Sequence, residues 1–305
     1  MRRLVLIGAG VLLATGSCAM SGVPPVNAPA TPTVPALPVP GPVVPAAPPA
    51  RVSDFHLSGE PRQGGVILGR APASTTSLQF NGAPLPMDNA GRFLIAFDRD
   101  AGNTATLRAV LADGHMVERT LTVAPGHWRI EQVDASPIGA AATTAEFKAR
   151  RAGELAQIDA ARRINAVSDG WRQRFIWPVK ARISGLFGAQ RIYRGTPGSY
   201  HSGVDLAGGA GTPFVAPADG VVILAASQPF TLEGNLLMID HGMGLNSAFL
   251  HCARLDVKEG DVVHQGQMLG AIGMTGRATG PHLHWGMKWN AARIDPMLLA
   301  GDMSD

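Results

Sequence analysis

Six of the nine histidines in this sequence fall between positions 201 and 284, and two short patterns among them could do chemistry. One is His201-Ser-Gly-Val-Asp205, and the other is His282-Leu283-His284. Side chains of an extended chain alternate between its two faces, so residues at even spacing share a face. Each pattern therefore brings two polar side chains together on one side of a strand, where they could bind the same ligand.

Two histidines and one aspartate would suit a catalytic zinc ion. Zinc binds imidazole nitrogen and carboxylate oxygen, and its catalytic sites use three protein ligands and leave one position open. Non-haem iron also takes two histidines and a carboxylate, commonly as His-x-Asp or His-x-Glu, so the longer His-x-x-x-Asp spacing favours zinc. The structural alternative is that His282 and His284 are ordinary residues on the polar face of a strand.

Short apolar segments separated by glycine-rich turns surround both patterns and predict the β domain that must position them. Leu283, between the paired histidines, is expected to point into the core of that domain. The expected strands cover residues 183–187, 221–226, 236–240, 247–250, 268–272 and 282–287.

The order of the motifs along this half of the chain resembles the lysostaphin-like zinc metalloendopeptidases. The resemblance covers roughly residues 176–295 and does not extend to the N-terminal half. The segments that carry it are HSGVD (201–205), GTPFVAPADGVV (211–222), MIDHGMGL (238–245), FLH (249–251), GDVVHQGQMLGAIGMTGRATG (260–280) and GPHLHWG (280–286).

This resemblance implies an antiparallel-β peptidase domain with an open groove at residues 176–300, and one zinc ion held by His201, Asp205 and His284. It also implies a substrate, the peptide cross-links or stem peptides of bacterial peptidoglycan. A zinc-bound water would be the nucleophile, because the metal lowers the pKa of that water to about 7.

The same resemblance leaves His251 and His282 as catalytic histidines without metal. One would assist the attack of water on the peptide carbonyl, and the other would steady the tetrahedral intermediate or protonate the leaving amine. A tyrosine can aid the oxyanion in a similar family, and of the two tyrosines here Tyr193 is the candidate. His241 also matches the family but is expected to be structural.

Three rival interpretations remain. Cys252 follows His251, where the family usually has an aliphatic residue, and could form a Cys–His nucleophile; adjacent strand residues face opposite sides, which argues against it. A second alternative is a catalytically silent envelope protein that activates cell-wall amidases, as some members of the resembling family do. The third is a purely structural envelope lipoprotein.

The N-terminus predicts export. Arg2 and Arg3 precede an apolar run at residues 4–13 and a small-residue stretch, which is the layout of a signal peptide over residues 1–18. Cys18 resembles a lipobox cysteine, which indicates a periplasmic, membrane-anchored lipoprotein. The alternative is cleavage after Ala19, which would leave a soluble periplasmic or secreted protein.

The rest of the chain predicts a mainly β protein. Residues 19–50 form a Pro/Ala-rich linker, and residues 51–133 alternate short apolar runs with turns, as in a small immunoglobulin-like β-sandwich. Thr143 and Glu146 have the spacing of a capping box, so a linker helix is expected over residues 143–167.

The charge gives little support to nucleic-acid binding. The formal net charge of +3 comes from 26 basic and 23 acidic residues, and removing Arg2 and Arg3 leaves +1. No basic run occurs elsewhere, so we expect no nucleic-acid partner.

Overall fold

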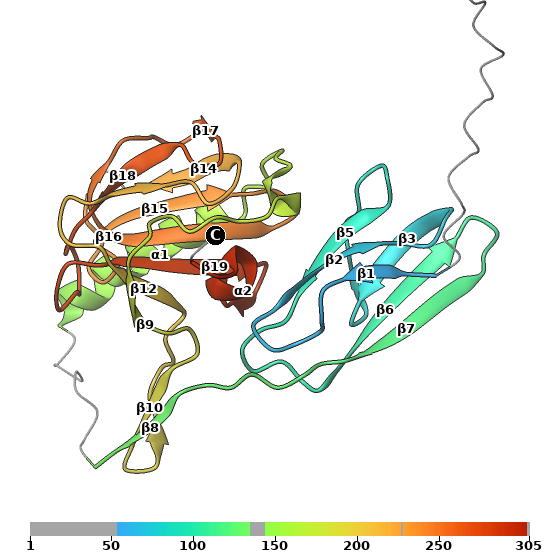
Figure 1. Cartoon of the computed structure of the whole chain (residues 1–305), viewed down its shortest axis with the longest axis horizontal. Coiled ribbons are helices and arrows are strands. Elements are labelled where there is room, and N and C mark those ends of the chain that lie inside the picture. Colours follow the sequence, from blue (N-terminus) through green and yellow to red (C-terminus); the bar gives the residue numbers. More distant parts are fainter. Residues whose placement is uncertain (1–53, 135–143, 227, 304–305) are drawn as a thin grey trace, which may run out of the picture. The chain divides into compact units, whose positions relative to one another are not determined.

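The computed structural model describes residues 54–134, 144–226 and 228–303. The predicted signal peptide with Cys18 and the Pro/Ala-rich linker lie outside these residues. Within the described part, no helix is both long and apolar enough to cross a membrane. The fold is mainly β, with N-terminal sheets, one long helix and a C-terminal antiparallel β domain (Figure 1).

Two antiparallel sheets form the N-terminal part. Alternating apolar side chains of both sheets are buried, as the strand pattern requires. Strands β6 and β7 form a hairpin, and Asn81-Gly82 joins β3 to β4. The first sheet has the order β1 (His56–Ser58), β2 (Val66–Arg70), β5 (Arg92–Ala96), and the second β4 (Ala83–Pro84), β3 (Thr75–Phe80), β6 (Thr104–Leu111), β7 (Met116–Thr122).

A ten-stranded antiparallel sheet carries both histidine patterns. Its central order is β17-β14-β15-β16-β19-β12-β9; β13 and β18 pair with each other, β18 also pairs with β16, and β20 pairs with β19. All six expected strands are present, and Leu283 is fully buried as predicted. The strands are β9 (Arg182–Gly185), β12 (Gly203–Ala207), β13 (Pro213–Val215), β14 (Gly220–Ala225), β15 (Asn235–Asp240), β16 (Leu245–Leu255), β17 (Val262–Val263), β18 (Met268–Ile272), β19 (Leu283–Trp289) and β20 (Ala292–Ile294).

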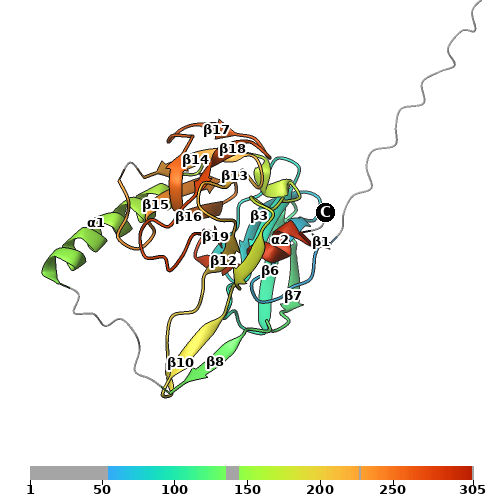
Figure 2. The same cartoon turned by 60° about the vertical axis from the view of Figure 1, so that its left-hand side comes forward.

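The long helix α1 (Ala145–Arg162) lies along one face of this sheet (Figures 1 and 2). Its Ile158 packs into an apolar cluster with Leu236 and Met238 of β15. The buried carboxylate of Glu154 accepts hydrogen bonds from the backbone N–H and hydroxyl of Thr231, both at 2.6 Å. The helix is therefore anchored by apolar contact and by a satisfied buried charge.

The predicted start of this helix is off by one residue. Thr144 is the N-cap, and its hydroxyl accepts a hydrogen bond from the backbone N–H of Phe147. Phe147 then occupies the third helical position, where a capping box needs Glu or Gln, so Thr144 does not form a capping box, and Thr143 lies outside the described residues. The helix also ends at Arg162 rather than at 167.

A small third sheet and two short helices complete the described chain. In this sheet β10 pairs in parallel with β8 and antiparallel with β11, a pairing that the sequence did not predict. Its strands are β8 (Ile130–Val133), β10 (Gln190–Tyr193) and β11 (Thr196–Pro197), and the short helices are η1 (Gly170–Arg172) and α2 (Pro296–Ala300).

Candidate metal centre

Three donor atoms from the two histidine patterns meet where β12 pairs with β19. Asp205 lies directly opposite His284 in the strand register, and His201 lies just before β12. His201 Nε2 is 3.0 Å from Asp205 Oδ1 and 3.0 Å from His284 Nδ1. His284 Nδ1 is 2.9 Å from the same Asp205 oxygen. Residues as far as 83 positions apart in the chain thus form one compact triangle of donors.

Hydrogen bonding orients the His201 ring. Its Nδ1 lies 3.0 Å from the carbonyl oxygen of Leu186. A carbonyl can only accept, so in the neutral ring Nδ1 carries the proton and Nε2 offers its lone pair to the cluster. The ring is therefore held in the tautomer that a metal ligand requires.

Burial and close contacts set the charges of the cluster. Burial raises the pKa of Asp205, but hydrogen bonds and charge from His201 and His284 outweigh it and hold that pKa well below its usual range. Burial lowers the pKa of His284. For His201 burial also acts to lower the pKa, but the hydrogen bond and charge of Asp205 raise it overall. The carboxylate is thus ionised at neutral pH.

These residues fit a divalent metal such as zinc. Two imidazole nitrogens and one carboxylate oxygen are ligands that zinc binds at about 2.0–2.2 Å, so donors about 3 Å apart can share one ion. The lone pair of His201 Nε2 also faces the carboxylate of Asp205, an arrangement that only a proton or a cation between them makes favourable.

The three ligands occupy space that is open because two neighbouring residues are glycines. A Cβ atom on Gly185 would overlap Asp205 Oδ2 and lie 3.1 Å from His201 Cε1. A Cβ atom on Gly203 would lie 2.7 Å from His284 Nε2. The strands on either side of the cluster must therefore lack side chains at these two positions.

We expect Gly185→Ala to weaken zinc binding by about tenfold or more, comparable to the loss of an outer-shell partner, because the methyl group would displace Asp205. Zinc titration against a competing chelator measures this directly. Gly102→Ala is the matched control, since a Cβ there meets nothing within 4 Å. Unchanged zinc affinity in Gly185→Ala would show that the ligands tolerate the added methyl group.

His251 reaches the cluster through a β-bulge in β16. Asn235 pairs with Cys252 and Leu237 with Phe249, so two residues of β16 lie opposite one residue of β15. His251 is one of these two, and its φ of +66° is in the left-handed region that side chains other than glycine rarely adopt. Its ring lies 6.5 Å, centroid to centroid, from that of His284.

His251 and His282 lie beside the site, each with its Nδ1 at a backbone carbonyl oxygen. His251 Nδ1 lies 2.8 Å from the carbonyl oxygen of Thr275, and His282 Nδ1 lies 2.9 Å from that of Gly280. Each Nδ1 therefore carries the proton of the neutral ring and leaves the Nε2 lone pair free. The two rings are 4.8 Å apart, and His282 Nε2 is 3.7 Å from Asp205 Oδ1.

The comparisons with known proteins agree with this geometry. The family model described as peptidase family M23 matches residues 199–296, which contain the three donors of the cluster together with His251 and His282. The C-terminal domain belongs to peptidase family M23. The match ends there, and the N-terminal sheets lie outside it.

The chain is also similar to named peptidoglycan enzymes. The chain is 40% identical over 114 residues to peptidoglycan DD-endopeptidase ShyA of Vibrio cholerae, covering 37% of this chain and 26% of the relative. It is 36% identical over 126 residues to DD-carboxypeptidase/endopeptidase Mpg of Neisseria meningitidis, covering 40% and 28%. The chain thus spans about a quarter of the length of these curated relatives.

One solved structure resembles more than the M23 domain. A Pseudomonas aeruginosa protein named for peptidase M23 superposes with a TM-score of 0.61 at 29% identity. The superposition covers 80% of this chain and 96% of that one. Since the M23 match covers residues 199–296 alone, the shared fold must include a large part of the chain before it.

Tyr193 lies away from the metal cluster. It belongs to β10, where it pairs with Val133 and Thr196, and the described residues give it no contact with the three ligands. Tyr200, next to His201, instead accepts a hydrogen bond of 3.2 Å from the Arg293 guanidinium. The structure thus offers no support for the oxyanion role expected of Tyr193.

The remaining candidates in the M23 domain occupy structural positions. Burial raises the pKa of the Cys252 thiol to about 12, which disfavours the thiolate that a Cys–His nucleophile needs. Burial lowers the pKa of His241 to about 4, and its ring nitrogens contact the Asp219 carbonyl and the Ser247 hydroxyl at 2.7 and 2.8 Å. His264 is exposed at a turn.

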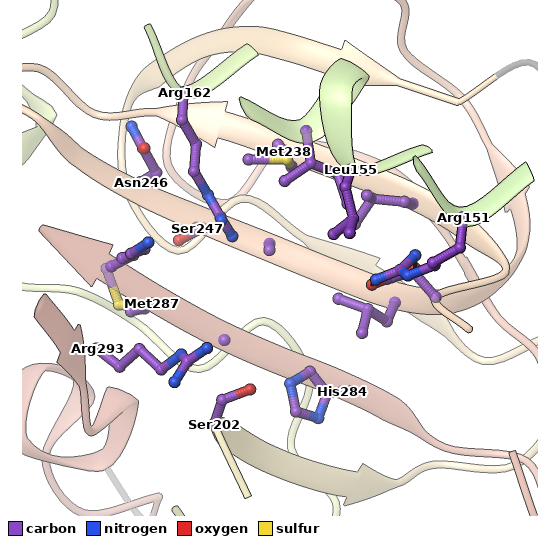
Figure 3. Close-up of a pocket in the computed structure, with 17 residues that line it drawn as sticks. Arg151, Leu155, Arg162, Ser202, Met238, Asn246, Ser247, His284, Met287 and Arg293 are labelled. Carbon is purple, nitrogen blue, oxygen red and sulfur yellow. Dashed lines mark hydrogen bonds and ion pairs between the residues drawn. The ribbon is translucent and has the colours of Figure 1, made fainter. Parts of the chain in front are cut away.

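A pocket of about 210 Å³ borders the metal cluster, between α1 and the face of the sheet that carries His284 (Figure 3). Met238, Ser247 and Met287 contribute to its sheet side, and Leu155 to its helix side. Sequence reasoning missed this wall of the pocket, because nothing local shows where a helix packs. The sheet side of the pocket could be predicted from the sequence, since residues 284, 286 and 288 share one face of β19.

Proposed function

We propose that this chain is a zinc-dependent endopeptidase that hydrolyses peptide cross-links or stem peptides of bacterial peptidoglycan. The observation that carries the proposal is the triangle of His201, Asp205 and His284 with the rings of His251 and His282 beside it. Three protein ligands with further acid–base groups beside them are the arrangement of a catalytic metal site rather than a structural one.

Two sets of residues would have different roles in the reaction. Zinc, when held by His201, Asp205 and His284, supplies Lewis acidity and makes water a stronger nucleophile at neutral pH. His251 and His282 offer Nε2 atoms that can take a proton from water and return one to the leaving amine. Burial lowers the pKa of His251, so its ring is neutral and able to accept a proton near pH 7.

The substrate class rests on the named relatives. ShyA is named as a peptidoglycan DD-endopeptidase and Mpg as a DD-carboxypeptidase/endopeptidase, and the family model that matches this chain covers the residues of the metal site. The pocket of about 210 Å³ beside His284 could bind part of an extended peptide by backbone hydrogen bonds. These two features support a peptide of the cell wall as the substrate.

Digestion of purified sacculi by the full chain tests the proposal. We expect about one zinc ion per chain and release of peptide fragments, which mass spectrometry of the soluble products would identify. Removal of zinc by a chelator should stop the release, and added zinc should restore it. A folded, zinc-loaded protein that releases nothing would contradict the proposal and favour the amidase-activating alternative.

The N-terminal part supports a second, structural proposal. We propose that residues 51–133 are a separate immunoglobulin-like sandwich and residues 176–300 the peptidase domain. The three-plus-four strand order, β1-β2-β5 and β4-β3-β6-β7, is compatible with that fold class. Each isolated segment should then unfold cooperatively on its own in denaturant, and a fragment without a transition would contradict the division.

We also propose that the protein is exported and anchored through lipid on Cys18. The support is the sequence alone: the Arg2-Arg3 pair, the apolar run and the small residues before Cys18. The mass of the mature N-terminal peptide decides this, because an unmodified N-terminus at Met20 would exclude lipidation.

A further inference from the structure

Three cationic side chains gather at the end of the pocket away from His284. Arg162 comes from the last turn of α1, Lys288 from β19 and Arg293 from β20, and all three line the pocket that His284 borders. Figure 3 shows Arg162 and Arg293 reaching into it from the helix side and the sheet side. The pocket thus joins the metal cluster to a concentration of positive charge.

Lys288 stands on the same face of β19 as His284. The two residues are four positions apart, so they lie roughly 13 Å apart along the strand, at about 3.3 Å per residue. Their partners on β16 are Asn246 and Leu250, which lie on the same face of that strand. A peptide running along this floor with its scissile bond at the cluster would pass the three cations about four residues away.

These cations have no anionic partner among the residues that the structure describes. Within the described residues, no carboxylate lies within ion-pair distance of Arg162, Lys288 or Arg293. Asp159 and Asp98 influence the charges only at longer range, and Asp98 Oδ2 accepts the backbone N–H of Arg293 at 2.8 Å. Arg151, also lining the pocket, shows the contrast: it is fully paired with Glu233 at 2.6 and 2.7 Å.

Arg162 is also incompletely satisfied. Its Nε is buried and lacks a hydrogen-bond partner, whereas buried donors are nearly always paired. Burial and the nearby charges of Arg162 and Arg293 lower the pKa of Lys288. An anion at this point would supply the missing acceptor and relieve the repulsion between like charges.

We propose that Arg162, Lys288 and Arg293 form a carboxylate-binding subsite that selects peptides with a free carboxylate about four extended residues from the scissile bond. The planar fork of arginine suits a carboxylate, and a lysine beside it adds charge without a fixed geometry. This inference rests on the proposed peptidase function, since it assigns the specificity of that same groove.

Soluble muropeptides in two forms test the subsite on the full, zinc-loaded chain. One form keeps its free carboxylates, and the other has them converted to amides by carbodiimide coupling with ammonia. For the wild type we expect kcat/KM to be about 10–100-fold higher on the free form, the range of a hydrogen bond to a charged group. Lys288→Met should remove most of this preference by lowering kcat/KM on the free form alone.

Two further variants separate the outcomes. Lys258→Met, at an exposed turn, is the matched control and should keep the full preference. If Lys288→Met fails to fold, Arg162→Gln should show the same loss of preference. Equal rates on both forms in the wild type, or an unchanged preference in a folded variant, would overturn the subsite.

If the wild type cleaves neither form, the proposed function fails. The subsite can then still be tested by measuring how tightly the protein binds each form. Calorimetric titration of the same two muropeptide pools should then show tighter binding of the free form to wild type than to Lys288→Met. Equal binding of the two forms would overturn the inference.

Discussion

Replacing His284 by alanine is expected to abolish zinc binding and peptide hydrolysis together. His284 contributes one of three donors, its Nδ1 contacts both other ligands within 3.0 Å, and its side chain is buried. Lewis acidity supplies several kcal/mol to such a reaction, so we expect hydrolysis to fall by about 10³-fold or more. Metal analysis of the purified variant and digestion of sacculi measure the two losses.

His264→Ala controls for the loss of an imidazole. Its side chain is 75% exposed and lies outside the cluster, so zinc content and activity should match the wild type. Circular dichroism and thermal unfolding should show that His284→Ala retains the β fold. Stoichiometric zinc in a folded His284→Ala would contradict the assignment of this residue as a ligand.

Strand periodicity made part of the cluster predictable. The spacing of His282 and His284 put both on one face of the chain, and the pairing of β12 with β19 placed Asp205 opposite His284. His201 lies just before β12, so its 3.0 Å contact with Asp205 does not follow from strand spacing. Only the resemblance, and not the spacing, separated His284 from His282. The six expected strands followed from the same local signals.

The parts that escaped prediction depend on register and tertiary packing. The bulge that turns His251 toward the cluster is one extra residue in a long strand, and no residue type marks it. The need for Gly185 appears only when β9 lies beside Asp205. The role of Arg162 appears only when α1 packs on the sheet, and the helix start shifted because Thr143 and Thr144 are chemically equivalent caps.

Replacing His251 by asparagine is expected to stop hydrolysis while zinc stays bound. His251 lies beside His282 and outside the three ligands, and its Nδ1 contacts the Thr275 carbonyl oxygen. Loss of a general acid or base lowers kcat by about 10²–10⁴-fold. Asparagine is chosen because it tolerates the left-handed backbone better than alanine, so the bulge should persist.

The two histidine variants should differ in zinc binding. His284→Ala should lose metal and activity, whereas His251→Asn should lose activity alone, with zinc content measured on the same preparations. His264→Asn provides the matched exchange at an exposed site. If His251→Asn lost zinc as well, His251 would have to be a ligand, and if it kept full activity, proton transfer would have to run through His282 without it. Either result would require different roles for His251 and His282 beside the same three donors.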